Sequence, residues 1–243
     1  MPASSTSSQE APPRSASSAS HDVLHRFVGQ AARALGRHGL VHAYGHCSQR
    51  IDKESFLVCP ARPMGLVAPG ERGTVVPVKG PLPEGVLGEV RIHQRIYATR
   101  PDIGAVVRSM PPATLALSTA KLVPSPRHGM GAYFGSGIGF WDDPQLIRDD
   151  QASDAVVSAM GKHSAVVMRG NGLVIAADSL IAATVLTWYF EDAARMELAV
   201  RSAGLQNDSV VLDADECKRR ASRTGQIFER MWEFLTAGDP DLT

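Results

Sequence analysis

Apolar residues recur at the three-to-four-residue spacing of a helix in six segments of the chain. The predicted helices cover residues 21–38, 88–99, 111–118, 154–160, 180–203 and 213–235. Gly36 and Gly39 close the first helix, and Pro101 ends the second because the residue before a proline disfavours helical geometry. Asp178 or Ser179 can cap the long fifth helix.

Short runs of β-branched residues between these helices predict strands at residues 56–59, 74–78, 103–107, 165–168 and 173–176. The last two flank a Gly-Asn-Gly turn, so they read as a strand pair. Residues 127–143 are rich in glycine and aromatic residues, which predicts a loop or irregular strand that walls a site. Strands and helices do not alternate regularly, which favours an α/β domain with a mixed or antiparallel sheet.

Charge and composition limit the kinds of binding partner that this 243-residue chain is expected to have. It has 25 basic and 25 acidic residues and no long run of either sign, which argues against nucleic acid or an anionic membrane surface as a partner. No apolar stretch approaches the roughly 20 residues that span a bilayer. Three cysteines without CxxC spacing favour a reducing compartment, so we expect a cytoplasmic protein. The Ser-, Pro- and Ala-rich residues 1–20 are expected to be disordered and dispensable.

Four segments, in order and suitably spaced, resemble the class II aldolase/adducin family. They are GLVHAYGHCSQR at residues 39–50, GEVRIHQRIYATRPD at 88–102, AVVRSMPP at 105–112 and MRGNG at 168–172. The resemblance implies an α/β fold, the three-layer α/β/α class II aldolase-like domain with a mostly antiparallel central sheet, over residues 21–205. It also implies a homo-oligomer, commonly a tetramer, with active sites between adjacent subunits. Residues 206–243 are then expected to be a C-terminal helical arm onto a neighbour.

The chain departs from this family at the positions that hold its catalytic divalent cation. The family's three metal-binding histidines correspond to Arg108, Met110 and Asn171. Arginine offers no lone pair, methionine is a soft ligand suited to copper, and one asparagine is a poor zinc ligand. A catalytic zinc site needs about three protein ligands, so we expect no metal and no other cofactor.

Other family positions keep groups that can do chemistry. Glu89 corresponds to the acid/base glutamate of the aldolases, or it is now only a structural partner of Arg108. His46 and His128 correspond to histidines of the family's decarboxylase-like branch, which acts on hydroxylated aromatic, pyridine or ring-cleavage carboxylic acids. The hydroxyl donors of phosphosugar members are largely missing. His93 lies four residues after Glu89 and is interpreted as a helix-packing residue.

These matches favour a metal-independent lyase, of decarboxylase or C–C lyase type, that acts on a small hydroxylated or keto carboxylic acid. Arg108 replaces the cation, and Glu89 or His46 transfers the proton. The residues expected to bind the substrate are His128, Arg50, Asn171 and Tyr133. One alternative is a non-catalytic, adducin-like scaffold subunit. Another is a metal aldolase whose site has moved to His46, Glu89, His93 and His128.

Overall fold

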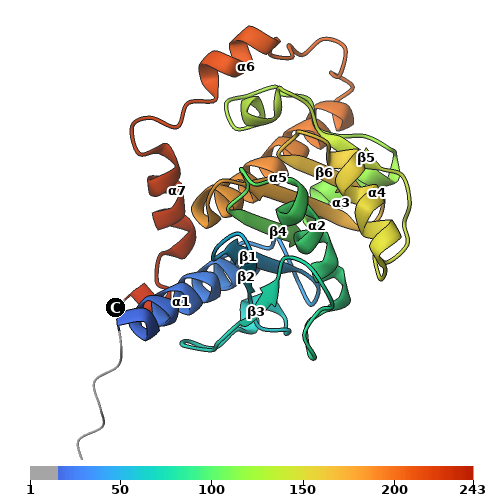
Figure 1. The fold of residues 1–243 in the computed structure, drawn as a ribbon. Helices are drawn as coiled ribbons and strands as arrows, with labels where there is room; N and C mark the ends of the chain where they lie inside the picture. The colour runs from blue at the N-terminus through green and yellow to red at the C-terminus, as the bar shows by residue number, and fades with distance from the viewer. Residues whose placement is uncertain (1–15, 243) are drawn as a thin grey trace, which may run out of the picture.

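Seven strands form one sheet at the centre of the chain, in a computed structural model that describes residues 16–242 (Figure 1). The strands are β1 (His46–Arg50), β2 (Ser55–Val58), β3 (Thr74–Pro77), β4 (Ala105–Ser109), β5 (Gly139–Trp141), β6 (Ala165–Met168) and β7 (Gly172–Ala177). Their order is β3-β2-β1-β4-β7-β6-β5, and β5 and β6 are parallel while all other neighbours are antiparallel. The predicted mostly antiparallel sheet is confirmed.

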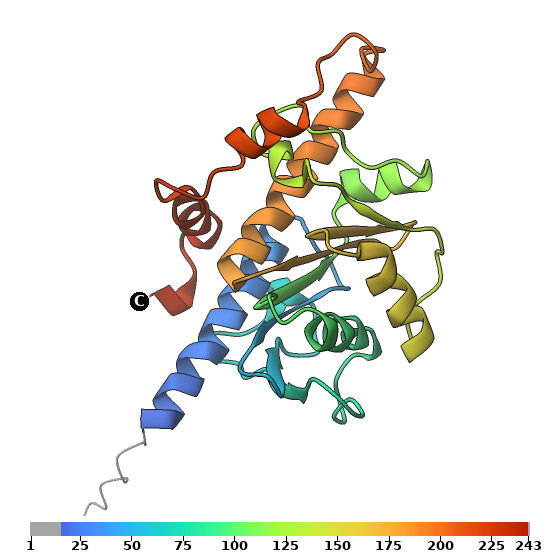
Figure 2. The same cartoon turned by 45° about the horizontal axis from the view of Figure 1, so that its top comes forward.

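Helices cover both faces of the sheet (Figure 2). The helices are α1 (Ala16–Arg37), α2 (Arg91–Thr99), α3 (Pro112–Thr119), α4 (Asp150–Met160), α5 (Leu180–Ser202), α6 (Ala214–Arg220) and α7 (Ile227–Thr236). α1 and α5 contact each other and one face of the sheet, while α2 and α4 pack together on the other. The predicted three-layer α/β/α domain is confirmed. None of the helices between residues 16 and 242 has the length and apolarity to cross a membrane.

Strand β1 shows how the layers are built from alternating side chains. Cys47 points toward α1, where its thiol lies 3.7 Å from the carbonyl oxygen of Val28. His46 and Ser48 point to the opposite face, where both contact His93 of α2. The sequence did not predict this strand, because its residues, HCSQR, lack the apolar alternation of a typical strand.

Most predicted boundaries agree with the structure to within a few residues. The α5 helix is capped by Ser179, whose hydroxyl accepts a hydrogen bond from the Ala182 amide at 3.2 Å, one of the two predicted caps. The α1 helix begins at Ala16, earlier than the predicted start at His21, so residues 16–20 are helical rather than disordered. Residues 1–15 of the predicted tail lie outside the described residues.

The single helix predicted over residues 213–235 is wrong. Helix α6 starts at a capping box made by Asp213 and Glu216 and ends at Arg220. The backbone then turns through Gly225 and Gln226, both with positive φ, before α7 begins at Ile227. Two consecutive left-handed residues cannot belong to a right-handed helix, so the segment is split in two.

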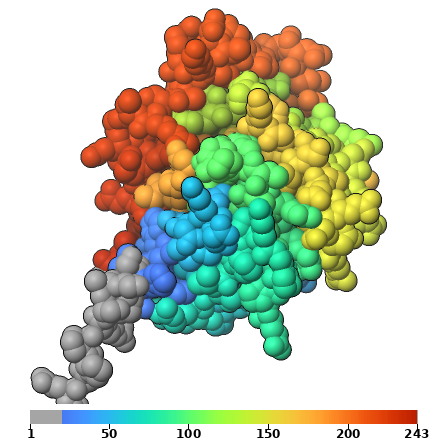
Figure 3. All heavy atoms as spheres, in the orientation of Figure 1, coloured from blue at the N-terminus to red at the C-terminus, as the bar shows by residue number. Residues whose placement is uncertain are grey.

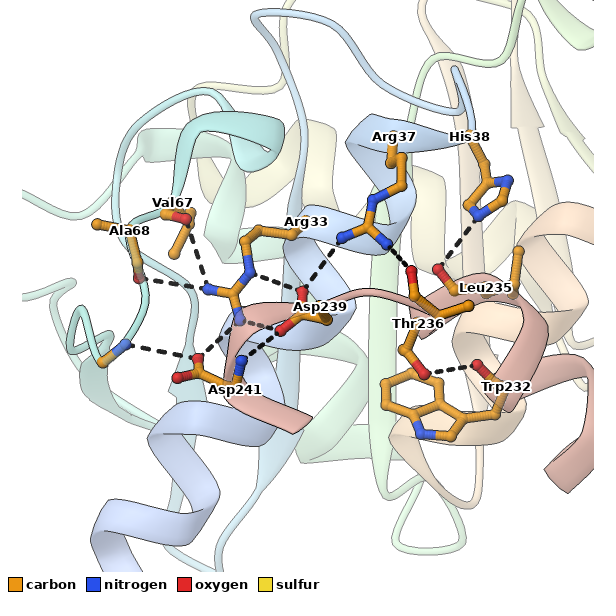
Figure 4. Close-up of polar contacts among 12 residues, drawn as sticks. Arg33, Arg37, His38, Val67, Ala68, Trp232, Leu235, Thr236, Asp239 and Asp241 are labelled. Carbon is orange, nitrogen blue, oxygen red and sulfur yellow. Dashed lines mark hydrogen bonds and ion pairs between the residues drawn. The ribbon is translucent and has the colours of Figure 1, made fainter. Parts of the chain in front are cut away.

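The C-terminal segment folds onto its own chain. Helix α7 packs against α1 and α5, and the space-filling view shows it seated along one side of the molecule (Figure 3). The guanidinium of Arg33 donates to Asp239 at 2.8 and 2.7 Å and to Asp241 at 2.7 Å (Figure 4). The Asp239 side chain is fully buried in this contact. In a single chain, helix α7, which belongs to the expected C-terminal arm, is therefore packed as part of the domain.

Candidate active site

A cavity of about 920 Å³ opens at one end of the central strands. It lies where β1 begins and β4 ends, between the β6–β7 turn and the short 3-10 helix Gly88–Val90 that precedes α2. Its polar lining residues are Tyr44, His46, Arg62, Glu89, Arg108, Arg148 and Asn171. Four of these, His46, Glu89, Arg108 and Asn171, were predicted from the sequence, and the fold brings them together.

The strand pairing explains why His46 and Arg108 share this cavity. They are directly opposite each other in the antiparallel β1–β4 pair, so their side chains leave the same face of the sheet. Asn171 reaches the same place from the β6–β7 turn. A Cβ on Gly172 would lie 2.2 Å from the carbonyl oxygen of Ser109, so only glycine lets this turn close against β4.

Arg108 is a buried cation with an incomplete set of partners. Its side chain is 2% exposed, and its Nη2 donates to Oδ1 of Asn171 at 2.7 Å and lies 3.1 Å from Oε2 of Glu89. The expected proximity of Arg108 and Glu89 is confirmed. Among the described residues, Nε and Nη1 of Arg108 and Oε1 of Glu89 have no hydrogen-bond partner. Burial lowers the pKa of Arg108 and Glu89 opposes this shift, but a guanidinium keeps its proton in a protein.

These groups do not fit a divalent cation. The guanidinium of Arg108 stands at the centre of the set, and it would repel a metal ion rather than bind it. The hydrogen bond from Arg108 already occupies Oδ1 of Asn171, which is the side-chain oxygen that Asn171 could offer to a metal ion. Within residues 16–242, no three His, Cys, Asp or Glu side chains lie together in a group that could hold a metal ion. The cavity therefore has a fixed positive charge at Arg108, where the family resemblance leads us to expect a metal-binding histidine.

His46 begins a hydrogen-bonded chain that runs away from the cavity. Its Nδ1 lies 2.8 Å from Nε2 of His93, and Nδ1 of His93 lies 2.6 Å from the hydroxyl of Ser48. The Ser48 hydroxyl is in turn 2.8 Å from the hydroxyl of Tyr97. Nε2 of His46 has no partner among the described residues. His93, interpreted from the sequence as a packing residue, is thus bonded directly to His46.

Both histidines are neutral in the folded protein. Burial, then the neighbouring His93 and Arg108, hold the pKa of His46 well below its usual value. Burial, with a further contribution from Arg108, lowers the pKa of His93 to about 3. Desolvation and a nearby positive charge both disfavour imidazolium, so the two effects act in the same direction.

We expect the protein to lose stability as the pH falls from 7 to 5. Below its ordinary pKa of about 6.5, histidine in the unfolded chain binds a proton that the folded chain does not accept until about pH 3. His93 therefore contributes a loss of about 1.4 kcal/mol per pH unit below pH 6.5, or about 2 kcal/mol at pH 5, and His46 adds to this loss in the same direction. Urea denaturation at both pH values measures the loss. His93→Gln should show a smaller loss than the wild type, by about 2 kcal/mol at pH 5, and equal wild-type stability at pH 7 and 5 would contradict the assignment.

The other three predicted site residues lie outside the cavity in a single chain. Arg50 donates to the carbonyl oxygens of Tyr97, Arg100 and Ile103 at 2.9, 3.1 and 2.8 Å, which ties β1 to the end of α2. Its guanidinium is thereby occupied by backbone groups.

His128 and Tyr133 also lie elsewhere. His128 lines a separate surface hollow with Arg219 and Arg220, and its Nε2 is 3.7 Å from Asp192. Tyr133 donates to the carbonyl oxygen of Ser222 and packs against aromatic rings of α5 and α7. The predicted contact of Arg50, His128 and Tyr133 with a substrate stays a prediction.

Several cavity residues were missed by the sequence analysis. Tyr44 and Leu146 are exposed at 66% and 52%, and with Leu87 and Met110 they give the cavity an apolar wall. Arg62 and Arg148 add two guanidinium groups, of which Arg62 pairs with Glu71 at 3.0 Å. The β5–α4 loop that carries Leu146 and Arg148 has no pattern that separates it from an ordinary surface loop.

Comparisons with known proteins agree with the fold. Residues 27–198 match the family model described as Class II Aldolase and Adducin N-terminal domain. The chain is 31% identical over 207 residues to 3,4-dihydroxyphthalate decarboxylase of Arthrobacter keyseri, covering 76% of this chain and 81% of that one. It is 30% identical over 195 residues to the enzyme of the same name from Rhodococcus jostii (strain RHA1), covering 73% and 80%.

Solved structures show the same fold. An L-fuculose 1-phosphate aldolase from Glaciozyma antarctica PI12 superposes with a TM-score of 0.75 at 17% identity, covering 93% of this chain and 92% of that one. The L-fuculose-1-phosphate aldolase from Thermus thermophilus superposes with a TM-score of 0.66 at 25% identity, covering 79% and 100%.

Proposed function

The chain belongs to the Class II Aldolase and Adducin N-terminal domain family, and we propose that it is a decarboxylase-type lyase of this family that works without a metal. Its substrate is a small hydroxylated carboxylic acid. The observation that carries this proposal is Arg108, a buried and incompletely paired guanidinium in the cavity wall, at a position that corresponds by resemblance to a metal-binding histidine of the family. A scaffold has no need to bury a cation beside a carboxylate at a cavity wall, because desolvating the charge is costly.

In the proposed reaction, Arg108 supplies the electrostatic role of a cation. Its positive charge favours the substrate carboxylate and the negative charge that develops on the oxygens of the reacting molecule. Glu89 or His46 delivers a proton, taken up from solvent, to the carbon that bears the carboxylate. The bond from this carbon to the carboxylate then breaks, its electron pair returns to the organic product, and carbon dioxide leaves.

The composition of the cavity favours an aromatic acid with a second negative group. Tyr44, Leu87, Met110 and Leu146 offer apolar contacts for a flat ring. Among the lining residues that the structure describes, the arginines Arg62, Arg108 and Arg148 outnumber the carboxylates, represented by Glu89. The related enzymes from Arthrobacter keyseri and Rhodococcus jostii are named for 3,4-dihydroxyphthalate, an aromatic acid with two carboxylates and two hydroxyls. We therefore choose this compound as the first substrate to test.

The proposal also includes an oligomeric state. A cytoplasmic homotetramer, with active sites between adjacent subunits, would allow His128 and Tyr133 of one copy to approach the cavity of another. Sedimentation of the purified full chain measures its mass in solution, and a monomer at the concentrations used for assays would remove any role of these residues in substrate binding.

We expect the purified protein to release carbon dioxide from 3,4-dihydroxyphthalate and to keep this activity in a strong chelator. Carbon dioxide release and the loss of the substrate's ultraviolet absorbance measure turnover, and elemental analysis measures the bound metal. The expected metal content is far below one ion per chain, because the donor groups are unsuitable. About one zinc or manganese per chain, with activity lost on chelation, would contradict the metal-independent reaction.

A binding measurement distinguishes the lyase hypothesis from the scaffold alternative. If the protein neither turns over nor binds hydroxylated mono- and dicarboxylic acids, by calorimetry at millimolar ligand, the scaffold alternative is favoured. Binding without turnover would retain the cavity as a carboxylate site and reject the lyase reaction.

A further inference from the structure

His93 contacts His46 on the side of the ring that faces away from the cavity. It is fully buried and does not line the cavity, yet its Nε2 lies 2.8 Å from Nδ1 of His46. A neutral imidazole has one N–H donor and one acceptor nitrogen, and the hydrogen bond at one nitrogen fixes which of the two carries the proton. The contacts of His93 therefore decide the tautomer of His46.

The direction of these hydrogen bonds follows from the contacts of Tyr97, the residue that ends the hydrogen-bonded series from His46. The Tyr97 hydroxyl lies 2.8 Å from the Ser48 hydroxyl, where either oxygen can donate, and 3.2 Å from the Ser48 carbonyl oxygen, which can only accept. The proposed order of hydrogen bonds takes the shorter contact as the one to which Tyr97 donates. The Ser48 hydroxyl is then free to donate to Nδ1 of His93, at 2.6 Å. His93 is neutral, so its single proton is on Nε2 and is donated to His46.

This order leaves one position for the proton of His46. Nδ1 of His46 accepts from His93, so the proton of the neutral His46 ring is on Nε2. Nε2 is the nitrogen without a partner among the described residues, and His46 lines the cavity. A buried donor without a partner costs free energy, which a substrate oxygen would recover.

We propose that His93, held by Ser48, is a positioning residue that fixes His46 as the Nε2–H tautomer, so that His46 donates a hydrogen bond to an oxygen of the substrate. The role toward the substrate rests on the proposed function, whereas the tautomer does not. If His46 gave up its Nε2 proton, the hydrogen-bonded chain could replace it at Nδ1 only by drawing a proton from the Tyr97 hydroxyl, and burial raises the pKa of that hydroxyl. His46 therefore binds and orients, and the proton transfer falls to Glu89.

The tautomer is measured directly by nuclear magnetic resonance. Long-range proton–nitrogen correlations of the uniformly ¹⁵N-labelled full chain at pH 7 distinguish a protonated ring nitrogen from an unprotonated one, and the spectrum of His46→Asn identifies the His46 signals. The expected result is a protonated Nε2 and an unprotonated Nδ1. A protonated Nδ1 with a free Nε2, or an imidazolium, would overturn the proposal.

A pair of variants at position 93 tests the cause. The amide of His93→Gln keeps a donor for Nδ1 of His46, so the Nε2–H tautomer should persist. His93→Leu removes the donor, and Ser48→Ala removes the group that orients His93, so both should give mixed tautomers at His46. Tyr97→Phe leaves the Ser48 hydroxyl in place and is expected to change the tautomer least. If His93→Leu does not fold by circular dichroism, Ser48→Ala carries the test, and an unchanged tautomer in Ser48→Ala would contradict the proposal.

Kinetics with 3,4-dihydroxyphthalate test the role toward substrate. Loss of the group that fixes the tautomer of a catalytic histidine can cost up to about 10,000-fold, so kcat should fall by at least about 10-fold in His93→Leu and recover in His93→Gln. A residue that serves only stability would lower the melting temperature in both variants without this difference in kcat, and that result would reject the positioning role. If the wild type does not turn over this acid, the proposed function fails on that substrate while the resonance measurement still decides the tautomer.

Discussion

Replacing Arg108 with methionine is expected to reduce turnover by about 1,000-fold or more, while the chain still folds. Loss of one well-placed donor to a developing negative charge costs about 100- to 1,000-fold, and Arg108 supplies a full charge in addition to its donors. Methionine fills a similar volume and leaves no unpaired cation in the sheet. Steady-state kinetics with the accepted acid measure kcat/KM, and circular dichroism with a urea titration measures the fold.

Two further variants separate the charge of Arg108 from its shape. Arg108→Lys keeps the charge without the planar donor fork, so we expect an activity between those of the wild type and Arg108→Met. Arg230→Met makes the same change on the exposed surface of α7 and should have wild-type kinetics. Full activity of a folded Arg108→Met protein would refute the replacement of the metal by arginine.

Replacing Glu89 with glutamine is expected to lower kcat by about 100-fold or more if Glu89 transfers the proton. The amide keeps an oxygen that can accept from Nη2 of Arg108, which lies 3.1 Å from Oε2 in the wild type. It removes the ionisable group and leaves Arg108 without its counter-charge. We therefore expect a loss of stability as well, since an uncompensated buried charge is costly.

A nearby glutamate provides the control for this variant. Glu84 is exposed in the same connection between β3 and α2 and does not line the cavity, so Glu84→Gln should leave kcat unchanged. If Glu89→Gln and Arg108→Met both lower stability and neither alters ligand binding, the pair has a structural role and the scaffold alternative is supported.

Patterns with a physical cause in the local sequence predicted most of the fold. The long helix α5 and its Ser179 cap, the β6–β7 pair around Gly-Asn-Gly, and the helix after Glu89 were all recognisable. The three-layer order and the mostly antiparallel sheet came from the family resemblance, because strand order depends on pairings between distant segments.

The failures of prediction have physical reasons too. Strand β1 was missed because His46 and Ser48 are polar residues whose hydrogen bonds are made inside the protein, to α2. The break between α6 and α7 depends on two left-handed residues, and only Gly225 marks it in the sequence. Helical periodicity over residues 213–235 concealed this break.

The candidate site was predicted where family motifs converge and missed where they do not. Glu89, Arg108, His46 and Asn171 meet at one cavity because the motif positions keep the family's backbone geometry. The bond between His93 and His46 was not foreseen, because a histidine on an apolar helix face looks the same whether it packs or donates. Arg148 lies in a loop whose position depends on the rest of the fold.

The contact between Arg33 and Asp239 makes the chain almost a closed ring, because it joins residues 206 positions apart. Closing a loop of this length costs about 5 kcal/mol or more of chain entropy, so the packing of α7 against α1 and α5 must hold the two segments together along with the ion pair. Because the two ends of the described chain lie together in the fold, the same helices and strands could be connected in a different order along the sequence. A permuted chain, with its two ends linked and a new opening in the exposed β1–β2 turn at residues 52–54, would keep the Arg33–Asp239 contact and every strand of the sheet.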